Sequence, residues 1–398
     1  MGRVNTASAA PVKRYRFPFI DLKAEFASLR GELMAAVTRV FESQHFILGE
    51  EVEGLESELA EFLEVREAVT CASGTAALEL ALQALGIGPG DEVITTPFTF
   101  VASAGAVMQA RARPVFVDID PATFNLNPSL VEQAVTPRTR AIIPVHLFGL
   151  PAELGPVLEL ARRHQLAVIE DAAQAIGARA EGRPVGGLGT LGCFSFFPTK
   201  NLGAAGDGGL IATQDPALGA RLRLMRVHGS GSRYHYEILG TNSRLDALQA
   251  AVLRVKLRHL SERTRRRQEL ASRYSELFRQ AQLDKQVPAP FAPPERTHVF
   301  HQYVIRCARR DELRKFLAGS GLPSEIYYPV PLHLQPAFAP LGYRAGAFPQ
   351  AEAACREVLA LPIYPELDPG NQVAIVETIS KFYKAEARDE RREESKPS

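Results

Sequence analysis

Short apolar runs alternate with helical stretches along the first half of the chain, and this alternation constrains the fold more than any other feature. A strand that is followed by a helix and a second strand typically rejoins the same sheet in a parallel orientation. The pattern therefore predicts an α/β fold with a mainly parallel sheet that is covered on both faces. The strand candidates are 69–73, 92–96, 114–118, 141–145, 167–170, 193–197 and 209–213, with helices between most of them, for example at 129–135 and 154–164.

The second half of the chain begins with a long predicted helix from 245 to about 278, whose apolar residues recur at helical spacing. A Pro-rich loop at 287–294 follows, and a strand pattern resumes at 299–307. We expect the helix to link two domains. The predicted divisions are an N-terminal tail (1–17), a large domain (18–255), a smaller α/β C-terminal domain (256–384) and a mobile charged tail (385–398).

The charge balance is close to neutral, with 46 Lys plus Arg against 45 Asp plus Glu in 398 residues. Nothing in this balance calls for a nucleic acid or a membrane surface as a partner. The basic cluster from Arg263 to Arg267 is flanked by Glu262 and Glu269, which favours a solvated helix face over a nucleic-acid patch.

Four widely separated cysteines without a Cys-x-x-Cys pair suggest neither a disulfide framework nor a metal site. The N-terminus lacks the apolar region of a signal peptide, and no apolar run is long enough to span a bilayer. We therefore expect a cytoplasmic protein.

Lys200 follows the strand-like run 194–197 and precedes a Gly-rich loop that ends at 209. A desolvated amine there can lose its proton and attack a carbonyl as a Schiff-base nucleophile. Asp171 ends the run 166–169, at the sheet edge where α/β proteins bind ligands. A carboxylate at that edge can pair with the protonated pyridine nitrogen of pyridoxal phosphate (PLP). Considered singly, Lys200 is better explained as a solvated surface charge and Asp171 as a helix N-cap.

Two further segments reach the same predicted edge. Ser73, Gly74 and Thr75 open a predicted helix at 76–85, where free N–H groups either bind phosphate or serve an ordinary capping box. Phe98 and Phe100 follow the strand at 92–96, so that one of them can stack on a flat ring, although core packing is the commoner fate of phenylalanine.

Together these segments resemble the DegT/DnrJ/EryC1/StrS family of PLP-dependent nucleotide-sugar aminotransferases. The resemblance runs from about Ile20 to about Tyr383 and implies the PLP-dependent transferase fold type I, which is aspartate aminotransferase-like, with a large PLP-binding domain and a smaller C-terminal domain. The motifs that agree in order and spacing are 73–75, 99–100, 170–174, 195–200, 206–209 and 242–246.

The resemblance also implies a role for each matching residue. Lys200 is the catalytic lysine that holds PLP as a Schiff base and moves the proton, and Asp171 pairs with the pyridinium nitrogen. Gln174 contacts the phenolic oxygen of the cofactor, and Phe100 stacks on its ring.

The cofactor phosphate is implied to be held by Gly74, Thr75 and Ser195, and by Asn242 of the neighbouring subunit. The enzyme is then a homodimer with shared active sites.

The implied reaction is amino transfer from L-glutamate to a nucleotide-linked keto sugar, in amino-sugar biosynthesis for a surface polysaccharide or a glycosylated metabolite. Related dehydratases carry histidine in place of Lys200. Tyr234, His235 and the segment 242–246 look more like members that aminate C3 than like those that aminate C4. The acceptor is therefore expected to be a 3-keto hexose or a 3-keto uronate.

Two residues are candidates for substrate binding. Arg244 is either the partner of a substrate anion or a helix-start ion pair with Asp246. Tyr327 stands where some related C3 enzymes carry the histidine of His-Tyr-Pro, so a uronate and a 6-deoxyhexose both remain possible.

Three other functions were weighed. A PLP aminotransferase that acts on a cyclic ketone would share the cofactor motifs and differ only in pocket residues. A regulatory relative without turnover is disfavoured by the intact Lys200, Asp171 and Gln174. A nucleic-acid-binding module is disfavoured by the neutral net charge.

Overall fold

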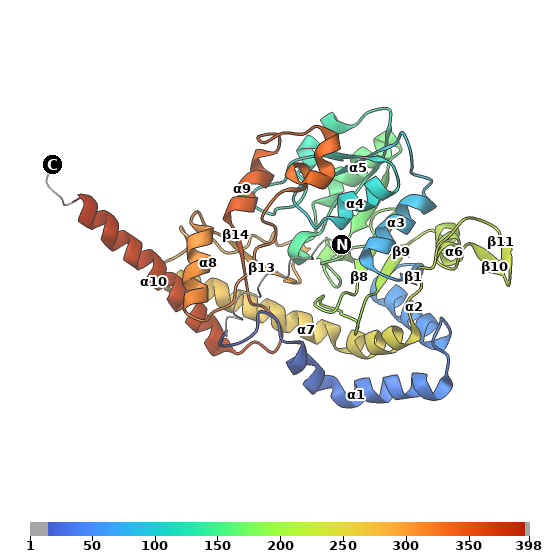
Figure 1. Ribbon diagram of the computed structural model, residues 1–398, viewed down its shortest axis with the longest axis horizontal. Helices are drawn as coiled ribbons and strands as arrows, with labels where there is room; N and C mark the ends of the chain where they lie inside the picture. Colours follow the sequence, from blue (N-terminus) through green and yellow to red (C-terminus); the bar gives the residue numbers. More distant parts are fainter. Residues whose placement is uncertain (1–14, 395–398) are drawn as a thin grey trace, which may run out of the picture.

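A seven-stranded sheet forms the centre of the larger part of the molecule (Figure 1). The computed structural model describes residues 15–394, with side chains described as far as residue 385. All seven predicted strands belong to this sheet, each within three residues of its predicted bounds, and the order across it is β1-β9-β8-β5-β4-β2-β3. The strands are β1 (Glu67–Cys71), β2 (Glu92–Thr95), β3 (Arg113–Phe116), β4 (Thr139–Ile142), β5 (Ala167–Asp171), β8 (Leu191–Ser195) and β9 (Gly209–Thr213).

The sheet is mainly parallel, as predicted, because only β9 runs antiparallel to its two neighbours. Parallel strands end at a common edge of the sheet. Asp171 of β5 pairs in register with Cys193 of β8, which brings the ends of these two strands together. The sheet therefore places Asp171 and Ser195 at the same edge.

Helices cover both faces of the sheet, as the alternating pattern requires. Helices α3 (Gly74–Ala84), α4 (Ala102–Gln109) and α6 (Pro216–Met225) share one buried core with β-strand residues such as Val69 and Ile169. On the other face, α5 (Leu154–His164) packs against Ile142 and Val168.

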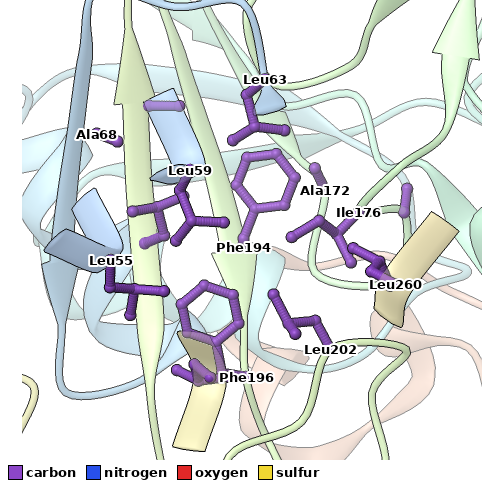
Figure 2. Packing of buried hydrophobic residues seen from close by; sticks show 14 of the residues in the cluster. Leu55, Leu59, Leu63, Ala68, Ala172, Ile176, Phe194, Phe196, Leu202 and Leu260 are labelled. Atoms are coloured by element: carbon purple, nitrogen blue, oxygen red, sulfur yellow. The ribbon is translucent and has the colours of Figure 1, made fainter. Parts of the chain in front are cut away.

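The core behind β8 and β9 is filled by helix α2 (Glu50–Phe62) and by α7 (Ala247–Gln280). Figure 2 shows Phe194 and Phe196 of β8 and its following loop among leucines of α2, with Leu260 of α7 and Leu202 close by. Because Phe196 is fully buried, the loop from Ser195 to Lys200 starts from a fixed position.

A second core surrounds the C-terminal half of α7. It is built by strands β13 (Tyr303–Arg306) and β14 (Val358–Leu361) with helices α8 (Arg310–Gly319) and α10 (Pro369–Glu394). The predicted boundary after residue 255 falls inside α7, which passes through both cores. Helix α9 (Pro349–Glu357) packs instead with Phe98 and Phe116 of the larger part. The division into two domains stays a prediction.

The N-terminal helix α1 (Leu22–Ser43) lies along α7, with Leu29, Leu33 and Val40 against Val255 and its neighbours (Figure 1). Its other face leaves Phe26, Met34 and Phe41 between 43% and 53% exposed. The remaining short elements are β6 (Arg179–Ala180), β7 (Arg183–Pro184), β10 (Ser230–Ser232), β11 (His235–Tyr236), β12 (Arg296–Thr297), and the 3-10 turns η1 (Pro128–Leu130), η2 (Glu132–Ala134), η3 (Leu147–Gly149), η4 (Leu332–Leu334) and η5 (Pro336–Leu341).

Two expectations were wrong. The predicted helix at 129–135 consists of the 3-10 turns η1 and η2, because only a short segment separates the prolines 128 and 137, and a residue before proline avoids the α conformation. The basic cluster is not entirely a solvated face: Arg267 is 5% exposed and donates to the carbonyl oxygens of Phe300 and Ile363.

The predicted tails are only partly covered by the structure. Residues 1–14 and 395–398 lie outside the described range. Helix α10 continues to Glu394, so residues 385–394 are helical, and their mobility stays a prediction. Within the described range, no helix is long and apolar enough to cross a membrane.

Candidate active site

Lys200 and Asp171 meet at the carboxyl edge of the sheet. The backbone N–H of Lys200 donates to the carbonyl of Phe197 at 2.8 Å, which closes a tight turn directly after β8. Burial lowers the pKa of the Lys200 amine to about 8, and the nearby carboxylate of Asp171 opposes this shift. A lysine with this pKa is partly neutral near physiological pH, as a nucleophile or a general base must be.

The carboxylate of Asp171 is buried and oriented by two donors. Ser103 Oγ donates to Oδ2 at 2.6 Å, and the backbone N–H of Ala173 donates to Oδ1 at 3.2 Å. Thr99 Oγ1 lies 3.0 Å from Ser103 Oγ, and because the Ser103 proton goes to Asp171, Thr99 is the donor in this pair. Sequence reasoning missed Ser103; its spacing of four residues from Thr99, just after a strand that ends at the same edge, was the available signal.

The turn from Ser73 to Thr75 caps a helix and is also compatible with phosphate binding, the two functions that the sequence left open. The Ser73 hydroxyl caps helix α3 by accepting from the N–H of Ala76 at 3.1 Å. The N–H groups of Gly74 and Thr75 belong to the first helical turn and have no acceptor within the helix. They remain available for an anion.

Gly74 allows this turn to approach β8 closely. A Cβ at residue 74 would lie 2.6 Å from Cβ of Ser195 and 3.2 Å from its Cα. Only glycine fits at this distance, and the approach brings together Gly74 and Ser195, two of the residues that the resemblance implies hold the phosphate. The space between the strand end and the helix start forms the cradle in which a phosphate would be held.

Of the two candidate phenylalanines, Phe98 is fully buried in the core and Phe100 is 55% exposed. Phe100 keeps a free face for a planar ligand, and its ring centroid lies 6.4 Å from that of Tyr328.

Gln174 is held at both ends of its side-chain amide. Its Oε1 accepts from the N–H of Phe148 at 2.6 Å, and its Nε2 donates to the hydroxyl of Tyr328 at 3.0 Å. Nε2 carries a second hydrogen, which can serve a ligand oxygen. Burial raises the pKa of Tyr328, so its hydroxyl stays protonated. Tyr328 was missed by sequence reasoning, which pointed to its neighbour.

His301 and Asn201 complete the buried surroundings of Lys200. The amide of Asn201 donates through Nδ2 to the carbonyl of Val299 at 3.1 Å, so its Oδ1 is the acceptor that faces Nδ1 of His301 at 3.3 Å. Burial, followed by the charge of Lys200, moves the pKa of His301 well below its ordinary value. His301 is therefore neutral and adds no charge beside the amine.

Asn242 and Arg244 lie apart from this cluster, whereas Tyr327 borders it through Tyr328, with ring centroids 6.0 Å apart. Asn242 is exposed on the segment between β11 and α7, and Arg244 on the same segment is half-buried. Among residues 15–385, Arg244 forms no ion pair, so the alternative role, a helix-start ion pair with Asp246 or a neighbour, does not occur. Tyr327 is half-buried and packs beside Phe19, with ring centroids 6.3 Å apart.

The donor set fits PLP. The site offers a partly neutral amine, a buried carboxylate, an anion-binding helix start and an aromatic ring with one free face, all at one edge of the sheet. No group of three or more metal-ligating side chains occurs in the part of the chain that the structure describes.

Comparison with known proteins points the same way. The model of the DegT/DnrJ/EryC1/StrS aminotransferase family matches residues 27–380. A pleiotropic regulatory protein from Geobacillus stearothermophilus is 51% identical over 92% of this chain and 98% of its own length. A UDP-N-acetyl-3-dehydro-alpha-D-glucosamine 3-aminotransferase from Acidithiobacillus ferrooxidans is 48% identical over 91% and 96%.

Among solved structures, DesV from S. venezuelae in complex with a ketimine intermediate superimposes with a TM-score of 0.89. The two chains are 46% identical, and the match covers 93% of this chain and 98% of that one.

Proposed function

Because this chain belongs to the DegT/DnrJ/EryC1/StrS aminotransferase family, we propose that it transfers an amino group from L-glutamate to C3 of a nucleotide-linked keto sugar. The chain is a PLP-dependent aminotransferase. The observation that carries the proposal is the placement of Lys200 and Asp171 at one sheet edge, in a chain 48% identical to a nucleotide-sugar 3-aminotransferase. The product is an amino sugar for a polysaccharide or a glycosylated metabolite.

Bound PLP supplies a carbonyl carbon for the amine and an electron sink for the substrate carbon. Lys200 would attack that carbonyl carbon in its neutral form, which the lowered pKa of about 8 makes accessible. Once displaced by the amino donor, Lys200 Nζ would accept the proton from the donor carbon and deliver it to the cofactor carbon within the same half-reaction, and would move a proton in the opposite direction when the keto acceptor binds. Asp171, which is aimed by Ser103, holds the positive charge of the protonated pyridine nitrogen.

The remaining cofactor contacts belong to the same proposal. Gln174 directs the free hydrogen of Nε2 to the phenolic oxygen, and Phe100 stacks on the ring with its exposed face. Gly74, Thr75 and Ser195 hold the phosphate with the N–H groups of the α3 start and the Ser195 hydroxyl.

A homodimer with shared active sites is supported by an apolar surface on α1 that is exposed among the described residues. The exposed Phe26 and Met34 of α1 border a hollow of about 380 Å³ that also includes Pro198, two residues before Lys200. Exposed apolar surface of this kind typically marks an interface. In such a dimer the exposed Asn242 reaches the cofactor phosphate of the partner.

The acceptor sugar is proposed to contact Arg244 and Tyr327. Arg244 has no carboxylate partner among the described residues, which leaves its guanidinium for the diphosphate or a uronate carboxylate. Competing a 3-keto hexose against a 3-keto uronate distinguishes the two acceptors. A regulatory role without turnover, which the name of the relative from G. stearothermophilus raises, is disfavoured because the cluster around Lys200 is complete.

The cytoplasm is the proposed compartment. All four cysteines, Cys71, Cys193, Cys307 and Cys355, are buried free thiols, and a reducing compartment preserves that state.

An absorption spectrum with and without L-glutamate tests the function. We expect a visible cofactor band in the purified protein that is replaced by a near-ultraviolet band when glutamate is added. Subsequent addition of a nucleotide-linked 3-keto sugar should restore the visible band. If the protein shows no visible absorption band even after addition of PLP, the proposed transamination is wrong. A normal response to glutamate without restoration by any keto sugar would point to another ketone, such as a cyclic one.

A further inference from the structure

A buried ion pair lies beneath the segment that carries Asn242. Arg226 caps the end of α6, and its Nη1 donates to Glu56 of α2, to the carbonyl of Thr70 at 2.8 Å and to the hydroxyl of Thr70 at 3.0 Å. The side chains of Arg226 and Glu56 are each 8% exposed. This cluster, which we call the Arg226 clamp, consists of Arg226, Glu56 and Thr70.

Glu56 is also tied to the strand independently of Arg226. Its Oε1 accepts from the backbone N–H of Thr70 at 2.9 Å and from the Thr70 hydroxyl at 2.8 Å. Thr70 is on β1, three residues before Ser73, where the expected phosphate turn begins. The clamp therefore anchors Arg226 to the strand that leads into the phosphate turn.

The backbone next to Arg226 pairs directly with the segment around Asn242. The N–H of Ser243 donates to the carbonyl of Arg226 at 3.0 Å, and the N–H of His228 donates to the carbonyl of Thr241 at 3.0 Å. Val227 and Asn242 form an isolated antiparallel bridge. Apart from these ties, the loop between residues 228 and 242 is exposed, with Tyr234 77% and Leu239 89% exposed. The N–H of Thr241 also donates to the carbonyl of Met225 at 2.8 Å, so residues 225–228 pair with the backbone on both sides of Asn242.

Burial of a guanidinium and a carboxylate is expensive, and such a pair contributes little to net stability compared with apolar side chains of the same shape. Such pairs can instead favour one arrangement of the chain over others. The Arg226 clamp connects two segments whose arrangement it could determine. One end holds the strand before Ser73, and the other holds the backbone that presents Asn242.

We propose that the Arg226 clamp is a positioning device that fixes Asn242 for its contact with the cofactor phosphate of the partner subunit. Arg226, Glu56 and Thr70 touch neither substrate nor cofactor and act through Asn242. The inference rests on the proposed function, because it requires that Asn242 reaches across a dimer.

The test measures the dissociation constants of PLP and of pyridoxal, which lacks the phosphate, for the cofactor-free dimer. Arg226→Lys keeps the charge and removes the Nη1 group that donates to both Glu56 and Thr70. We expect this variant and Asn242→Ala each to weaken PLP binding about tenfold, since a hydrogen bond to a charged group is lost, while pyridoxal binding is unchanged. The double variant, with Arg226→Lys and Asn242→Ala, should bind PLP no more weakly than Asn242→Ala alone, because both substitutions remove the same contact between Asn242 and the phosphate.

Arg310→Lys is the matched control. Arg310 is likewise a buried arginine at a helix terminus, here the start of α8, and it donates to the carbonyl of Val358 at 3.1 Å in the C-terminal part of the chain. We expect it to leave PLP binding unchanged. If Arg226→Lys does not yield folded protein, Glu56→Gln provides the same comparison with the shape of the acceptor retained.

The outcomes separate the two proposals. If Asn242→Ala leaves PLP binding unchanged, the contact across the dimer is wrong and the positioning role falls with it. If Asn242→Ala weakens PLP binding but Arg226→Lys has no effect, adds to it, or weakens pyridoxal equally, only the positioning role is overturned.

Discussion

The hydroxyl of Ser103 donates a hydrogen bond of 2.6 Å to Oδ2 of Asp171, and both groups are buried. The two residues are 68 positions apart in the chain. They meet because the loop after β2 brings the start of α4 to the sheet edge at which β5 ends, across the intervening β4. A hydrogen bond to the charged form of a carboxylate stabilises that form. Ser103 therefore supports the ionised Asp171 that a protonated pyridine needs opposite it.

Replacing Ser103 with alanine should lower kcat about tenfold, because a hydrogen bond to a charged group contributes about 1.5–3 kcal/mol. The effect should fall on kcat rather than on KM for the sugar, since Asp171 acts on the cofactor ring. Steady-state kinetics measure the split. Ser324→Ala, another buried serine, whose hydroxyl has no partner in the described structure, is the control and should leave kcat unchanged. Equal kcat values for Ser103→Ala and the control would contradict the role.

Lys200→Ala should abolish transamination while the protein remains folded. The loss of the general base alone costs roughly 10²–10⁴-fold in rate, and the covalent attachment of the cofactor is lost as well. Single-turnover assays with glutamate measure the loss, and circular dichroism checks the fold. The exposed Lys285→Ala serves as control and should retain activity. Substantial turnover by Lys200→Ala would show that another group moves the proton.

The rate at which the cofactor-free protein captures PLP should rise with pH, with a midpoint near the Lys200 pKa of about 8. Only the neutral amine is a nucleophile, so the rate is low below the pKa and reaches a plateau above it. A solvated lysine would place this midpoint near 10.5. Stopped-flow absorbance between pH 6 and pH 10 measures the midpoint.

Asp171→Asn tests in which direction the Asp171 charge moves the pKa of Lys200. The Asp171 carboxylate opposes the lowering of the Lys200 pKa, so its removal should move the midpoint of PLP capture to lower pH. A shift to higher pH would contradict the electrostatic link between the two residues.

Gly74→Ala should weaken PLP binding at least about tenfold, through loss of hydrogen bonds to a charged phosphate, and should leave pyridoxal binding unchanged. The added Cβ would lie 2.6 Å from Cβ of Ser195, which is fixed at the end of β8, so the turn must move away from the phosphate cradle. Gly155→Ala is the matched control, since Gly155 is in the first turn of α5 and has no atom within 4 Å of the added Cβ. Equal weakening of pyridoxal would indicate general disruption.

The sequence by itself determined the sheet and the cofactor. Seven strands were predictable because an apolar run flanked by turn residues can be buried in only a few ways, and all seven joined one sheet. The order and spacing of the motifs from 73–75 to 242–246 resemble those of the family, and the family model confirms the resemblance. The cofactor followed from that resemblance. The helix predicted at 129–135 was wrong because the prediction weighed local helix propensity alone. It did not consider that the two prolines, 128 and 137, leave few residues for an α-helical hydrogen-bond ladder.

Only the tertiary structure decided which side chains support the reactive pair. Ser103 with Asp171, Tyr328 with Gln174, and Arg226 with Glu56 are separated by 68, 154 and 170 positions. No periodicity joins residues at such distances, because their contacts depend on where whole elements pack. The resemblance pointed to Phe100, and the tertiary structure supplies a physical reason: the ring of Phe98 is buried in the core, whereas that of Phe100 is exposed. The pKa of Lys200 likewise follows from the burial that the assembled fold imposes on its amine.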